Sequence, residues 1–69
     1  MAWYFAYATL LSDGTIMVDL NVSKQREVCE EVAASSRQLT GMLVSACEQF
    51  DVPPTVIISG DRKRLTLQR

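Results

Sequence analysis

A turn signal between two apolar runs near the start of the chain constrains the fold more than any other feature. Asp13-Gly14 separates the runs 3–11 and 16–22. Asp-Gly is strongly favoured in two-residue type I′ turns, because both central positions of that turn need a positive φ. The sequence therefore predicts a β-hairpin with this dipeptide at its tip, in which Leu11 is paired with Ile16.

That pairing predicts which side chains of the hairpin form the core. Successive residues of a strand face opposite sides of the sheet. We expect the larger, apolar face to be the core, and it consists of Trp3, Phe5, Tyr7, Thr9, Leu11, Ile16, Val18, Leu20 and Val22. The opposite face is smaller and mixed, and it consists of Tyr4, Ala6, Ala8, Leu10, Met17, Asp19 and Asn21.

The segment 24–50 has the spacing of an amphipathic helix. At about 100° per residue, its apolar side chains fall on one side of a helix, and the stripe keeps its phase across Gly41. Ser23 is suited to cap the N-terminus, and Pro53-Pro54 stops the helix. The pattern predicts one continuous helix roughly 40 Å long, which exceeds the length of the sheet beneath it.

A second, shorter hairpin is expected after the prolines. The segment 55–59 is β-branched, 60–63 is a turn, and 64–68 alternates between polar and apolar residues. The expected cross-strand pairs are Leu65 with Ile58 and Leu67 with Val56. The predicted fold is α+β with the order ββαββ. It is a small antiparallel sheet with one long amphipathic helix packed on one face, in a single domain that spans residues 1–69.

This architecture leaves apolar surface without a cover and predicts a protein partner. A chain of 69 residues has a small core, and one helix can cover only one face of the sheet. We therefore expect a homodimer, the commonest soluble oligomer. The contact is expected on the open sheet face, on an open strand edge or on the acidic helix face. The side chains expected in contact with a partner are Tyr4, Leu10, Met17, Ile57, Glu30 and Glu31.

The two cysteines are expected to be buried apolar residues with no chemistry. In a continuous helix Cys29 and Cys47 would lie roughly 27 Å apart, far beyond the reach of a disulfide. The sparse cysteines, and the lack of a visible signal peptide or membrane span, favour a reducing, cytoplasmic compartment. The chain has no histidine, no facing carboxylates and no glycine-rich loop. We therefore expect no enzymatic activity, no metal and no cofactor.

The charge is unevenly distributed. The net charge is −1, yet residues 60–69 sum to +3 and residues 1–59 to −4. The leading interpretation is a small non-enzymatic protein–protein interaction module, a regulator or inhibitor that covers a surface of a larger partner. Short chains without motifs of this kind are associated with phages and mobile elements. The alternative is a nucleic-acid-binding regulator that uses Arg62, Lys63, Arg64 and Arg37.

Overall fold

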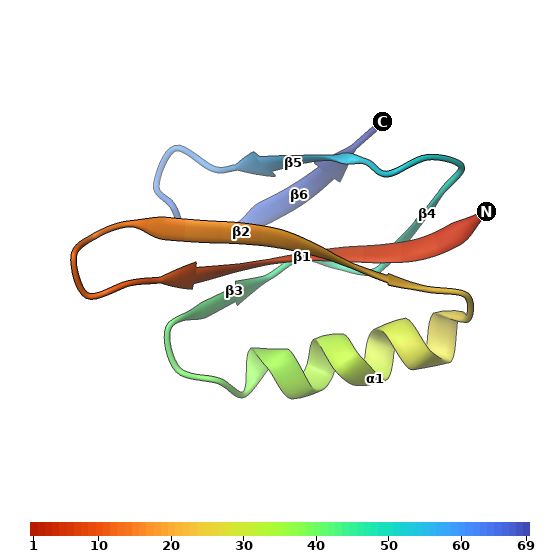
Figure 1. The fold of residues 1–69 in the computed structure, drawn as a ribbon, viewed down its shortest axis with the longest axis horizontal. Helices are drawn as coiled ribbons and strands as arrows, with labels where there is room; N and C mark the ends of the chain where they lie inside the picture. The colour runs from red at the N-terminus through yellow and green to blue at the C-terminus, as the bar shows by residue number, and fades with distance from the viewer.

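The protein has a small α+β fold, as predicted, with one helix and six strands. The computed structural model describes all residues from 1 to 69. Its elements are β1 (Ala2–Leu10), β2 (Ile16–Ser23), α1 (Arg26–Arg37), β3 (Met42–Val44), β4 (Glu48–Phe50), β5 (Thr55–Ile58) and β6 (Leu65–Gln68). Strand β1 is central: β2 pairs with one edge, and β3 and β4 share the other. The helix covers one face of this sheet and the β5–β6 hairpin covers the other (Figure 1).

The first hairpin forms, but its predicted register is wrong by one residue. Leu10 opposes Ile16 and Ala8 opposes Val18 along the antiparallel β1–β2 pair. A shift of one residue exchanges the faces of one strand relative to the other. Trp3, Phe5 and Tyr7 still face the helix, but the apolar residues of β2 now face the β5–β6 hairpin.

The turn explains this difference. The amide of Gly14 donates to the carbonyl oxygen of Leu11 at 3.0 Å, and the amide of Leu11 donates to the carbonyl oxygen of Thr15 at 2.8 Å. Gly14 has a φ of +88°, whereas Asp13 does not have a positive φ. The connection is thus a three-residue loop with a left-handed glycine, the second commonest hairpin class, and not a type I′ turn. The extra loop residue moves the register.

The prediction of one long helix is wrong. Helix α1 has 12 residues and ends at Arg37, with Gln38 as its C-cap. Gly41, three residues beyond this cap, has a φ of +78°, a left-handed conformation that favours glycine and that a continuous helix does not contain. The chain then reverses, so that β3 and β4 run antiparallel to β1. The apolar stripe of this segment serves a strand, because pairing with β1 buries it better than an overhanging helix could.

Strands β3 and β4 are two parts of one strand interrupted by a β-bulge. Val44 opposes Tyr7 and Glu48 opposes Tyr4, so three residues lie against two of β1. Ser45 stabilises the bulge through two hydrogen bonds to Ala6. Its amide donates to the carbonyl oxygen of Ala6 at 2.8 Å, and its Oγ accepts from the amide of Ala6 at 2.7 Å. The bulge turns both Val44 and Cys47 toward the helix, although they are three positions apart and would face opposite sides of a regular strand.

The interpretation of the cysteines is therefore also wrong. Cys29 on α1 and Cys47 in the bulge form a disulfide, and their Cα atoms are 6.3 Å apart. The bond ties the helix to the sheet beside the buried side chain of Phe5. It also removes the argument for a reducing compartment, because structural disulfides persist mainly in oxidising environments.

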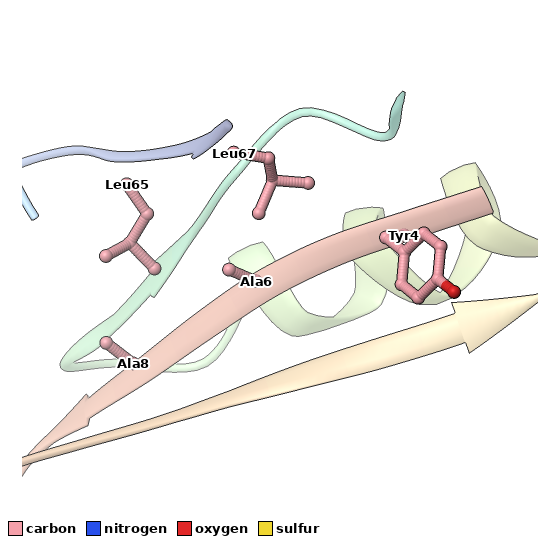
Figure 2. Packing of buried hydrophobic residues seen from close by; sticks show 5 residues of the cluster. All are labelled: Tyr4, Ala6, Ala8, Leu65 and Leu67. Carbon is pink, nitrogen blue, oxygen red and sulfur yellow. The ribbon is translucent and has the colours of Figure 1, made fainter. Parts of the chain in front are cut away.

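The second hairpin has the predicted pairs, but it forms a sheet of its own. Ile58 opposes Leu65 and Val56 opposes Leu67. The two leucines point down onto β1 (Figure 2), where they form the second part of the core. The buried members of this cluster are Tyr4, Ala6, Ala8, Leu65 and Leu67. Small alanines on β1 leave room for the leucines, and the face expected to be open is thereby covered.

Candidate functional site

Titratable groups form no reactive cluster anywhere in the chain. No three of the acidic, histidine or cysteine residues lie close enough together to hold a metal ion. Local hydrogen bonds lower the pKa of two exposed carboxyl groups. That of Asp13 is lowered mainly by the amide of Thr15, and that of Asp61 mainly by the hydroxyl of Ser59. Both acids belong to hairpin turns, where such bonds are structural.

The predicted partner contacts do not form one surface. Tyr4 is 8% exposed beneath the β5–β6 hairpin, so the prediction of a contact through Tyr4 is wrong. Leu10 and Met17 are exposed, but the register places them on opposite faces of the sheet. Ile57 lies on the outer face of β5, opposite Thr66.

The two predicted acidic contacts lie on the helix, away from the apolar ones. Glu30 accepts a hydrogen bond from Arg26 at 3.3 Å, and this is the only ion pair in the protein. Glu31 is exposed. The acidic helix face remains a solvated surface, and nothing in its geometry joins it to Leu10 or Ile57.

The four basic residues of the alternative interpretation are also separated. Arg37 donates from Nη2 to the carbonyl oxygen of Ser45 at 3.0 Å, so its side chain supports the bulge on the helix side. The cluster 62–64 lies in the β5–β6 turn, across the sheet from the helix (Figure 1). The structure therefore leaves three basic residues together, fewer than the sequence offered.

The outer edge of β2 is the feature that most needs a partner. Ser45 pairs with Ala6 through main-chain groups, so the main-chain groups of even-numbered residues of β1 point toward β3 and β4. Those of odd-numbered residues of β1 then point toward β2. The register consequently directs the main-chain groups of four β2 residues outward, away from β1. They are Ile16, Val18, Leu20 and Val22.

This open edge is apolar and only lightly protected. Val22 is 60% exposed and Met17 61%. The strand has no proline and a single charge, Asp19, whereas edge strands usually carry several such blocking features. Asp19 covers one outward group, because its Oδ1 accepts from the amide of Leu20 at 2.8 Å. Val18 and Val22 lie on either side of Leu20 along the strand.

Sequence reasoning expected an open strand edge among the possible contacts but did not identify β2 as that edge, because it followed side-chain faces and not the order of strands. The sequence did contain a signal for a lightly protected edge. In the segment 16–23, four β-branched or leucine side chains enclose two polar residues, and only one residue is charged.

No protein family, curated protein or solved structure matches the chain. The helix is neither long enough nor apolar enough to cross a lipid bilayer.

Proposed function

We propose that the protein is a non-enzymatic protein–protein interaction module that associates through the open edge of β2 and forms a homodimer. The observation that carries this proposal is the eight-residue edge strand with outward main-chain groups and exposed valines. Added strands gain affinity from main-chain hydrogen bonds and specificity from alternate side chains. The same edge suits a regulator or inhibitor that covers a strand of a larger partner.

One antiparallel register of two β2 strands fits the charges. Pairing Leu20 with Leu20 of a second copy places Val18 opposite Val22 and Asp19 opposite Asn21. In this register the partner's carbonyl oxygen replaces Asp19 Oδ1 as the acceptor for the Leu20 amide. Two β-branched side chains then face each other, and the carboxylate meets an amide. The register shifted by two residues would set Asp19 opposite Asp19, and like charges in direct opposition are destabilising.

The disulfide supports a place of action different from the predicted cytoplasm. A bond between Cys29 and Cys47 suits an oxidising compartment, where small domains use such crosslinks in place of a larger core. Alkylation of the protein as it is isolated from its natural source would count its free thiols. We expect none, and two free thiols would restore the cytoplasmic assignment.

The experiment for the dimer compares two lysine variants with matched exposure. Val22 and Val52 are both 60% exposed, but only Val22 lies on the β2 edge. Sedimentation equilibrium at micromolar concentration should give twice the chain mass for the wild type and for Val52→Lys. Val22→Lys should give the mass of a single chain while its circular dichroism spectrum stays unchanged.

Two results would contradict the proposal. A wild-type protein that stays monomeric up to millimolar concentration would exclude self-association. A dimer that survives Val22→Lys but dissociates in Val52→Lys would place the interface elsewhere. The mass measurement and the spectrum together separate a lost interface from a lost fold.

A further inference from the structure

A second feature lies at the end of the molecule where three turns meet. The β1–β2 turn, the loop after α1 and the β5–β6 turn come together at one end, while both chain termini lie toward the other (Figure 1). Between the three turns is a pocket of about 380 Å³, within the range of small-molecule sites. Its apolar wall and single charged group are Ala8, Leu10, Ile16, Met42, Leu43 and Arg62.

The pocket follows from the unequal lengths of the two stacked hairpins. Strand β1 has nine residues and β6 has four, or roughly 30 Å against 13 Å. The β6 leucines cover Tyr4, Ala6 and Ala8, but neither strand of the β5–β6 hairpin extends over β1 beyond Ala8. Leu10 consequently stays 59% exposed, although it lies on the side of β1 that the β5–β6 hairpin covers.

Arginine is held at the mouth of this pocket by the turn. Arg62 has a φ of +57°, in the left-handed region that favours glycine, and Gly60 two residues earlier has no positive φ. The amide of Arg62 donates to the carbonyl oxygen of Ser59 at 2.9 Å, which fixes the backbone there. Strained conformations of this kind cluster at binding sites. Arg62 also lines the adjoining hollow together with Gly14 and Ile58.

The guanidinium of Arg62 has no partner within the protein. The one ion pair joins Arg26 to Glu30, and the nearby acids are engaged in their own turns. Asp61 accepts from Ser59 and Lys63, and Asp13 accepts from Thr15. Lys63 and Arg64 add two more positive charges to the same turn.

We infer that this pocket binds a free amphipathic carboxylate with one alkyl chain. The chain lies on Leu10, Ile16 and Leu43, and the carboxylate is bound by Arg62, whose planar fork suits two parallel hydrogen bonds. An apolar wall beside an unpaired guanidinium complements both halves of such a molecule. The pocket shares Ile16 with the end of the β2 edge, but its other lining residues lie on β1, on β3 and in the adjoining turns, so binding does not require a second copy.

Decanoate, kept below its micelle concentration, is the probe for this site. In an amide-detected NMR titration we expect saturable shifts at Leu10, Gly14 and Gly41. Arg62→Gln should weaken binding roughly tenfold, as expected for a hydrogen bond to a charged group. Arg69→Gln changes the net charge equally at the far end of the chain and should leave the affinity unchanged. Leu10→Glu alters a side chain that is already exposed, and it should abolish binding without unfolding the protein.

Other outcomes would overturn the inference. Acetate shifts equal to those of decanoate would show that the alkyl chain contributes nothing. Equal affinities of the wild type and Arg62→Gln, or of decanoate and decanol, would show that the charge contributes nothing. Binding to anionic vesicles without a saturable response to decanoate would indicate a membrane surface contact. Well-dispersed amide spectra establish that each variant is folded.

Discussion

The two faces of the central sheet are covered by layers of different kinds. On one face, α1 buries only Cys29 and Ala33 and is tied to the sheet by a disulfide. On the other face, the β5–β6 hairpin is held by two leucines and has no covalent bond to the sheet. The protein thus combines a weakly packed but crosslinked layer with a better packed layer that is not crosslinked.

The difference shows what each layer lacks. The neighbours of the buried helix residues, Val28 and Val32, remain 45% and 37% exposed, so the helix buries a narrow strip. The hairpin strands have only four residues each, and two-stranded hairpins are marginal alone. The disulfide compensates for the narrow buried strip of the helix. Close packing of the hairpin leucines on the small alanines of β1 compensates for the short strands.

Removing the disulfide has the largest expected effect. We expect Cys29→Ala combined with Cys47→Ala to lower the free energy of unfolding by about 3 kcal/mol, since the bond closes a loop of comparable length to those that give this value. That approaches the whole net stability of a domain of this size. Urea unfolding followed by circular dichroism measures the loss.

Reduction of the wild type provides the control for this variant. A phosphine reductant should lower its urea midpoint to that of the double alanine variant and leave the variant unaffected. If reduction left the wild-type midpoint unchanged, the helix layer would be held by packing alone, and the contrast between the two layers would disappear.

The hairpin layer should respond to the loss of a leucine and not to reduction. Leu67 is 7% exposed and packs on β1, so Leu67→Ala should cost about 2–3 kcal/mol, the lower part of the range for buried leucines. Ile57→Ala, on the outer face of β5, should cost less than about 1 kcal/mol. The same urea titration compares the two, and equal costs would mean that the hairpin does not pack on β1 as described.

The sequence was sufficient for the elements whose local and tertiary preferences agree. The second hairpin has the predicted pairs because its β-branched strand and alternating leucines admit one arrangement. The first register could not be predicted, because Asp13-Gly14 is compatible with both two-residue and three-residue loops. Segment 42–50 is apolar at spacings that suit a helix and a bulged strand alike, and only pairing with β1 decides between them.

The positions of the candidate site residues depended on the parts of the fold that could not be predicted. The expectation that the second hairpin extends the sheet left Tyr4 on an open face, whereas this hairpin packs over that face and Tyr4 lies in the core. The wrong helix placed Cys29 and Cys47 far apart, whereas the bulge brings them together. Leu10 was singled out correctly as an exposed side chain, but its pocket depends on the relative lengths of two stacked hairpins, and no local pattern encodes that.

Ser45 hydrogen-bonds both to β1 and to Arg37 at the end of the helix, and its hydroxyl offers the finest test of the bulge. Its Oγ is the acceptor for the buried amide of Ala6, and Ser45 is 3% exposed. Ser45→Ala would leave that amide without a partner, at a cost of about 1–2 kcal/mol. Ser59 is the matched control, because its Oγ accepts from Lys63 and Arg64 in an exposed turn.

In Ser59→Ala, water replaces the lost acceptor, so the expected cost is below about 0.5 kcal/mol. Ser45→Ala should also raise the hydrogen-exchange rate of the Ala6 amide and expose the disulfide to reductant sooner, because the bulge positions Cys47. If both alanine variants lost the same stability and the Ala6 amide stayed protected, the hydroxyl would not hold the bulge. The crosslink would then fix the position of the helix without help from the strand beneath it.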